Sequence, residues 1–246
     1  MKRFKLVLKI VGGILSLFII ILLITEMEDI IYLKGNYFKL KCSSIYDSGN
    51  DAFNEGNYHK AVKNYKLAQM FDNAPYLKFN IALCYENMDD YDKAFKWYEK
   101  AAKKDFAAAQ FNLAIMYYNG TGVEPDLQQS FYWAKKAAEQ NFVPAQNLLG
   151  SLYYDGEGVE TDISQALHWW TLAADNGSSS AMIYLGKYYY ENKKYKDAKR
   201  WLNQALNSND ISGDMRTYAS ELLDDVKRAE STGLFEALTG LMLLGL

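Results

Sequence analysis

The feature that most constrains the fold is a segment that occurs twice. YYNGTGVEPDLQQSFYWAKKAAEQ at residues 117–140 returns as YYDGEGVETDISQALHWWTLAADN at residues 153–176. The dipeptides Ala109-Gln110, Ala145-Gln146 and Ala181-Met182 share this interval of 36 residues. Three shorter copies without the glycine loop flank these two, which gives five units from about Cys42 to Asp210. A period of this size predicts an array of stacked structural repeats.

Each unit has the pattern of two amphipathic helices. The first, for example AQFNLAIMYY, carries apolar residues at helical spacing. The second, for example QQSFYWAKKAAEQN, places alanine and aromatic residues on one face and Lys, Glu and Gln on the other. Neither helix can bury its apolar stripe alone, but stacked neighbours can share one core. The sequence therefore predicts an all-α fold, an α-solenoid of about five helix-turn-helix repeats preceded by one transmembrane helix.

The two glycine loops raise the question of a phosphate or calcium site. A phosphate loop follows a strand and contains a lysine, whereas here a helix precedes the loop and no Lys or Arg lies between Tyr117 and Tyr132. The acidic residues of the second loop also miss the ligand spacing of a calcium loop. We therefore predict connectors, with left-handed helix ends, turn glycines and helix N-caps. These positions are, in that order, Gly120 and Gly156, Gly122 and Gly158, Asp126 and Asp162.

Residues 1–25 have the pattern of a signal anchor that spans a membrane. The basic side chains of Lys2, Arg3, Lys5 and Lys9 are the only charges before Glu26. The uncharged stretch between Lys9 and Glu26, together with residues 6–8, reaches about 19 apolar residues. This is close to the ~20 that cross a bilayer as a helix. By the positive-inside rule the N-terminus is cytoplasmic. We expect a single-pass protein of a bacterial inner membrane with a periplasmic repeat domain. The alternative is a secreted protein whose signal peptide is cleaved.

Four further segments follow the anchor. They are a juxtamembrane segment (26–41), the repeat solenoid (42–210), a capping helix (211–230) and a hydrophobic C-terminal tail (231–246). The tail is too short to span a bilayer comfortably; an interfacial position, a partner contact and packing into its own groove all stay open. The repeat alignment separates Cys42 from Cys84 by more than the reach of a disulfide, so both are predicted to be free thiols.

One unit carries a specific family resemblance. AQNLLGSLYYDGEGVETDISQALHWWTLAADNG at residues 145–177 resembles a Sel-one-like repeat, and residues 117–138 match the same pattern. The first, second and fifth units resemble the shorter tetratricopeptide form. The resemblance to these families implies an α-solenoid that binds or scaffolds other proteins, here as a membrane-anchored bacterial member.

In these families the first helix of each unit lines the concave face, and that resemblance defines the candidate partner-binding residues. Aromatic side chains of this kind dominate binding hot spots, although packing between repeats is the alternative role for them. The first line of candidates is Phe53, Glu86, Tyr118, Tyr154 and Tyr190. The second line is Tyr46, Phe79, Phe111, Asn147 and Ile183, and the third is Asn50, Leu83, Ile115, Ser151 and Lys187.

Composition and motifs exclude several other functions. The basic N-terminus leaves a body more acidic than the net charge of −3, which disfavours nucleic acid. The two histidines, His59 and His168, lie in different units, and no metal-ligand or nucleophile motif is present. We expect a non-enzymatic scaffold or adaptor with a protein partner and without metal or cofactor. The alternatives are a periplasmic immunity protein that neutralises a secreted effector, a cell-envelope hydrolase, and membrane remodelling by the tail.

Overall fold

The computed structural model describes residue 35 and residues 39–243, with side chains up to residue 232. All regular structure in these residues is α-helix, as the repeat pattern predicts. The predicted membrane anchor at residues 1–25 lies outside the described residues, as does most of the juxtamembrane segment. In the part that is described, no helix combines the length and the apolar character that a membrane span requires.

The chain divides into two compact units, of which the first ends at Met88. It holds a helix over residues 39–54, α2 (Tyr58–Ala68) and α3 (Pro75–Glu86). Tyr65 is buried in its core, and the Tyr65 hydroxyl donates a hydrogen bond to Asn50 Oδ1 at 2.9 Å. Cys42 and Cys84 are both buried free cysteines. Burial raises the pKa of the Cys84 thiol to about 12, which disfavours the thiolate, the reactive form, at neutral pH.

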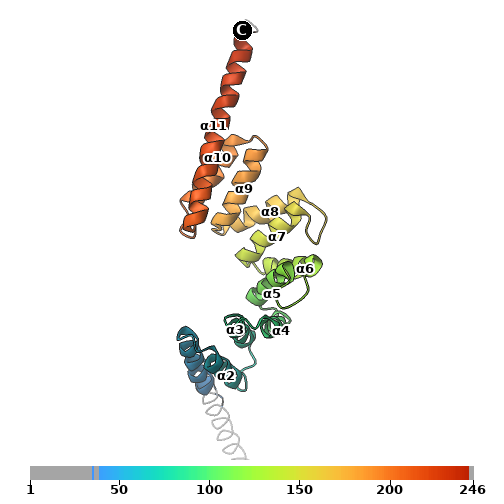
Figure 1. Cartoon of the computed structure of the whole chain (residues 1–246), viewed down its shortest axis with the longest axis vertical. Helices are drawn as coiled ribbons and strands as arrows, with labels where there is room; N and C mark the ends of the chain where they lie inside the picture. Colours follow the sequence, from blue (N-terminus) through green and yellow to red (C-terminus); the bar gives the residue numbers. More distant parts are fainter. Residues whose placement is uncertain (1–34, 36–38, 244–246) are drawn as a thin grey trace, which may run out of the picture. The chain divides into compact units, whose positions relative to one another are not determined.

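The second unit, residues 89–246, contains the glycine-loop repeats. Its helices are α4 (Tyr91–Ala102), α5 (Ala107–Asn119), α6 (Leu127–Glu139), α7 (Val143–Asp155), α8 (Ile163–Asp175), α9 (Ser179–Glu191), α10 (Tyr195–Leu206) and α11 (Gly213–Leu243). Each of these helices contacts the next along the chain. Figure 1 shows the resulting stack of helix pairs in chain order, which confirms the predicted α-solenoid.

The same ring contact fastens successive repeats of this unit together. Tyr117 packs edge-on against Phe95 with ring centroids 5.3 Å apart, and Tyr153 packs in the same way against Phe131 at 5.2 Å. The two contacts are displaced from each other by one repeat length. Such edge-to-face pairs add about 0.5–1.5 kcal/mol to the area that they bury. These tyrosines are therefore packing residues between repeats.

The glycine loops are connectors, as the sequence predicts. Gly120 and Gly156 end α5 and α7 in the left-handed conformation, with φ of 71° and 74°. The Asp126 carboxylate accepts a hydrogen bond from the Gln129 backbone N–H at 2.9 Å and so caps α6. Asp162 caps α8 through Gln165 in the same way, at 3.0 Å.

The second glycine of each loop lies against the preceding repeat. A Cβ atom on Gly122 would stand 2.4 Å from the Tyr91 carbonyl oxygen, at the start of α4. A Cβ atom on Gly158 would stand 2.0 Å from the Leu127 carbonyl oxygen, at the start of α6. Both positions also have positive φ. Each loop thus packs against a helix of the previous repeat, where no side chain fits.

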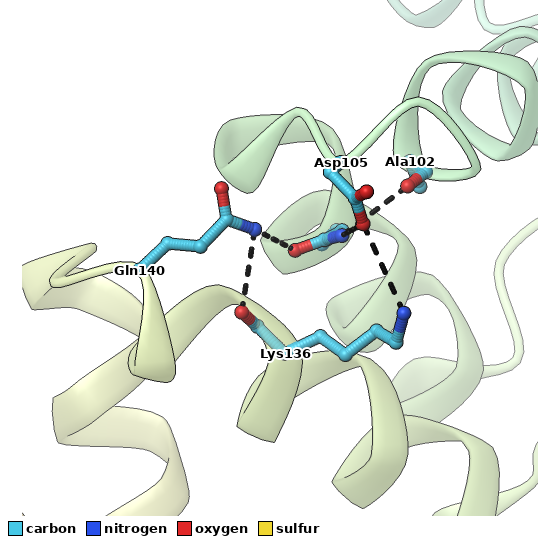
Figure 2. Close-up of polar contacts among 5 residues, drawn as sticks. Ala102, Asp105, Lys136 and Gln140 are labelled. Carbon is cyan, nitrogen blue, oxygen red and sulfur yellow. Dashed lines mark hydrogen bonds and ion pairs between the residues drawn. The ribbon is translucent and has the colours of Figure 1, made fainter.

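A polar network around one buried glutamine also joins three helices of this unit. The Gln110 side chain is fully buried, and its Nε2 donates to Ala102 O of α4 at 3.2 Å. Gln140, just after α6, donates to Gln110 Oε1 at 2.7 Å. Figure 2 shows Asp105 and Lys136 completing the cluster as an ion pair of 3.8 Å. Gln146 has the same arrangement one repeat later: it donates a hydrogen bond to Ala138 O and accepts one from Asn176.

The helix α11 covers the end of the last repeat. Ala219, Leu222, Leu223 and Val226 share a core with Leu202 of α10. Lys199 of α10 also pairs with Glu230 of α11 at 2.5 Å. The helix continues from the predicted capping segment to Leu243 without a break, so its backbone includes most of the predicted tail.

Candidate functional site

A groove of about 860 Å³ runs along the first helices of three successive repeats in the second unit. Its residues come chiefly from α5, α7 and α9. Trp170 of α8, Glu157, the loop over residues 176–178 and Asp210 complete the lining. The groove therefore occupies the helix face that the family resemblance predicts for partner binding.

Four of its rings form a connected cluster, which we call the groove aromatics: Tyr154, Trp170, Tyr184 and Tyr188. The Trp170 and Tyr184 rings are stacked, with centroids 5.3 Å apart and planes 14° from parallel. Tyr154 lies 5.2 Å from Trp170 and 6.4 Å from Tyr188. Because these rings hold one another, they present a preformed apolar surface to the groove.

Trp170 positions this cluster, and a glycine makes room for it. The side chain is 3% exposed and lies on α7 at Gly150, where a Cβ atom would approach Trp170 Cδ1 to 2.4 Å. Its indole Nε1 donates to Asn147 O at 3.3 Å. One repeat earlier the corresponding pair is Ala114 and Ala134, both buried. At this position the large ring is therefore present where the opposite residue is glycine, and alanine stands where it is alanine.

The groove carries more negative than positive charge. Its lining has four acidic side chains, the groove carboxylates Asp155, Glu157, Glu191 and Asp210, and the single cation Lys187. Lys187 pairs with Glu191 at 3.8 Å, but both side chains are about half exposed, so this pair contributes little. Burial and the negative charge of Glu157 raise the pKa of Asp155, although Lys187 opposes the change.

Two tyrosine hydroxyls in the groove donate to these carboxylates. The Tyr154 hydroxyl donates to Glu191 Oε2 at 3.2 Å. Burial and this negatively charged partner raise the pKa of Tyr154. A hydrogen bond to Glu157, followed by burial, raises the pKa of Tyr118. Both phenols are therefore neutral at physiological pH and can act as hydrogen-bond donors or apolar surfaces.

Asp210 lies in the groove lining. It follows α10 in the chain and caps the start of α9. Its Oδ2 accepts a hydrogen bond from the Ser179 backbone N–H at 3.2 Å, and its Oδ1 accepts from the Ser208 hydroxyl at 2.7 Å. Burial alone would raise the pKa of Asp210, but these hydrogen bonds outweigh burial and lower it. The ionised form is thus favoured in the folded chain.

We expect Asp210→Ala to lower the free energy of unfolding by about 1 kcal/mol at pH 7, the usual contribution of a helix cap. Because folding lowers the pKa, this stabilisation is present above the unfolded value of about 3.9 and is lost as the pH falls through the folded pKa. Urea unfolding of the wild type and the variant at pH 7 and below pH ~3 checks this. An equal difference at both pH values would contradict a role of the ionised carboxylate. Asp210→Asn, which keeps the acceptor oxygen, is the control.

The structure places three of the aromatic candidates from the sequence in this groove. Tyr118, Tyr154 and Phe111 line it, together with Asn147, Ile115, Ser151 and Lys187 of the second and third lines. Tyr190 does not line it, and its ring lies 6.3 Å from that of Tyr195, the first residue of α10. Ile183 is 2% exposed and belongs to the core.

The candidates of the first unit are described separately. Phe53 packs against Tyr58, the first residue of α2, at 5.4 Å, as Tyr190 does against Tyr195. A short connection thus places the first residue of the next helix beside the first-line aromatic. Tyr118 and Tyr154, which precede the long glycine loops, line the groove instead. Tyr46 packs between Tyr65 and Tyr76 at 5.8 and 5.2 Å. Phe79 is partly buried and Glu86 is exposed.

Three of the groove aromatics were not predicted from the sequence: Trp170, Tyr184 and Tyr188. Each occupies a position that differs between repeats, whereas the predicted residues were taken from equivalent positions of successive repeats. A usable signal was present in the sequence, because Tyr184 and Tyr188 are four residues apart and so share one face of α9. In the described residues, no group of three or more His, Cys, Asp or Glu side chains could hold a metal ion.

Comparison with known families fits this geometry. The Sel1 repeat model matches residues 107–142 and 143–178, the two units whose first helices are α5 and α7. A tetratricopeptide repeat model matches residues 76–106. The chain contains Sel1 and tetratricopeptide repeats. Repeats of these families form protein–protein interaction modules, and the Sel1 repeats of this chain supply two of the three groove helices.

Solved structures of similar Sel1-repeat proteins share the fold. A protective antigen present in uropathogenic Escherichia coli strains, with an SLR fold, is 26% identical with a TM-score of 0.62. That match covers 70% of this chain but only 40% of the antigen. A Sel1 repeat protein from Oxalobacter formigenes is 25% identical with a TM-score of 0.61, over 76% of this chain and 88% of that one. No curated protein matches the sequence significantly.

Proposed function

We propose that this chain is a membrane-anchored adaptor that binds a segment of a partner protein in the groove along α5, α7 and α9. The observation that carries the proposal is the groove itself: a preformed aromatic surface in a concavity of about 860 Å³. Tyr118 and Tyr184 remain 38% and 39% exposed there, although they are large apolar side chains. Tyrosine and tryptophan at the centre of a concave surface are the residues most often found in binding hot spots.

Two pairs of exposed tyrosines allow a matched test of this proposal. Tyr118 and Tyr184 line the groove, whereas Tyr132 on α6 and Tyr218 on α11 do not and are 47% and 44% exposed. We expect Tyr118→Ala with Tyr184→Ala to reduce recovery of the partner at least about tenfold, since each hot-spot residue contributes about 2 kcal/mol. Proximity labelling in cells that express each variant, with quantitative mass spectrometry, measures this recovery.

The control pair, Tyr132→Ala with Tyr218→Ala, also removes two tyrosine rings, but from outside the groove, and should leave recovery unchanged. Circular dichroism of both double variants verifies that each retains the helical fold. If the two pairs reduce recovery of the same proteins equally, the groove is not the binding site.

The anchor is the second part of the proposal. Its support is the uncharged sequence between Lys9 and Glu26 and the basic cluster before it. The repeat domain would then lie in the periplasm of a bacterium, held at the inner membrane by residues 1–25. Such an anchor keeps the groove close to envelope partners and raises its effective concentration there.

Reporter fusions test the location of the repeat domain. We expect alkaline phosphatase fused after residue 230 to be active, because this enzyme folds only outside the cytoplasm, and the product to remain in the membrane fraction after carbonate washing. Replacing Lys2, Arg3, Lys5 and Lys9 by glutamine should reduce the reporter activity by weakening the orientation signal. An inactive phosphatase together with a fluorescent cytoplasmic reporter at the same junction would refute the periplasmic location.

A further inference from the structure

The charge and the aromatic rings of the groove indicate which class of ligand it binds. Four groove carboxylates face one cation, and that cation is already within 3.8 Å of Glu191. The carboxylates stand beside the groove aromatics, whose ring faces carry the negative part of the aromatic quadrupole. A site with both features favours a positively charged group next to an apolar one.

We infer that the segment bound in this groove is basic, with an arginine or lysine side chain over the groove aromatics and apolar residues beside it. The inference rests on the proposed function, since it specifies the ligand of the same groove. The ligand is a polypeptide segment, because the lining extends over three helices and includes both charged and apolar positions.

The aromatic contacts show where the cation would lie. Tyr184 is stacked on the buried Trp170, is 39% exposed and lines the groove, so part of its side chain is accessible to a ligand. A guanidinium over the Tyr184 ring would continue the stack in the manner of known arginine–aromatic contacts. Elsewhere in the described structure Lys100 already lies 4.1 Å from the Trp97 ring centroid, and Arg200 lies 4.8 Å from that of Trp201.

The charges of the groove point in the same direction. Burial and, after it, the negative charge of Glu157 raise the pKa of Asp155, so the two carboxylates repel each other in the free groove. Tyr154 and Tyr118 satisfy one oxygen each of Glu191 and Glu157 but supply no positive charge. A basic side chain would relieve this repulsion, and an acidic one would add to it.

The test uses a random-peptide library displayed on phage and selected on the full chain. Peptides that also bind the Tyr118→Ala with Tyr184→Ala variant are removed first, so that groove-dependent binders remain. We expect the enriched peptides to contain arginine or lysine next to aliphatic or aromatic residues. The strongest of them is then synthesised, together with a version in which each basic residue is replaced by glutamine.

A neutralised groove provides the matched variant: Asp155→Asn, Glu157→Gln and Glu191→Gln. The control variant carries Glu124→Gln, Glu139→Gln and Glu221→Gln, which are exposed, lie outside the groove and change the net charge equally. We expect the neutralised groove to bind the synthetic peptide at least about tenfold more weakly, a loss of about 1.4 kcal/mol. The control variant should bind it within about twofold of the wild type.

The outcomes separate the two claims. If groove-dependent peptides are enriched but are not basic, or bind the neutralised groove as well as the wild type, the inference about charge fails and the binding function stands. If no peptide distinguishes the wild type from the groove-tyrosine variant, both the charge inference and the proposed function are overturned.

Discussion

Replacing Gly158 by alanine is expected to lower the free energy of unfolding by about 3 kcal/mol or more, the sum of a strained backbone and a steric clash. The residue has φ of +71°, and its added Cβ would lie 2.0 Å from the carbonyl oxygen and 2.5 Å from the carbonyl carbon of Leu127. These are backbone atoms at the start of α6, so no side-chain rotation relieves the contact. The loop must move away from the preceding repeat.

Gly56 provides the matched control for this prediction. Its φ of +73° is almost the same, but a Cβ atom there would meet nothing within 4 Å. Gly56→Ala should therefore cost only the backbone strain, about 1 kcal/mol. Urea unfolding, monitored by circular dichroism, measures the free energy of unfolding of both variants. Equal losses at the two positions would show that contact with Leu127 contributes nothing to stability.

The second large effect is expected for Trp170. Truncation to alanine should cost about 3–5 kcal/mol, as for other buried large aromatic residues, because the ring fills the space against Gly150. The same change removes the stacking partner of Tyr184 and the neighbour of Tyr154, so binding in the groove should be lost as well.

Trp170→Phe separates the ring from its hydrogen bond. Phenylalanine retains an aromatic face for Tyr184 but cannot donate to Asn147 O, and we expect a cost of about 1–2 kcal/mol. Thermal unfolding, with partner capture measured below the transition, tests both variants. If alanine and phenylalanine have the same effect on capture, the ring face at this position is not part of the recognition surface.

The sequence was sufficient for the parts of the fold that recur. Gly120 and Gly156 were predicted to end helices, and Asp126 and Asp162 to cap the next ones. Each pair occupies the same position in the two copies of the repeated segment. The contact of Gly158 with Leu127 was not predictable in this way. Both partners are in the sequence, but only the stacking of one repeat on the previous one brings the loop to the start of α6.

The site was only partly predictable, for a related reason. Recurring positions report the core that all repeats share, whereas the groove is shaped by residues that differ between them. Trp170 corresponds to Ala134 and Leu202 in neighbouring units, so alignment hides it. Tyr190 recurs with Tyr118 and Tyr154, yet the short connection places Tyr195 beside it and leaves it outside the groove.

The most direct test of the account is site-specific photocrosslinking in cells. A benzoylphenylalanine replaces Tyr184 in one strain and Tyr132 in another, two tyrosines of similar exposure on different faces of the repeats. We expect position 184 to form an adduct with one defined segment of a partner protein and position 132 to form none. Adducts with the same protein from both positions, or none from position 184, would contradict the claim that the groove is the binding site.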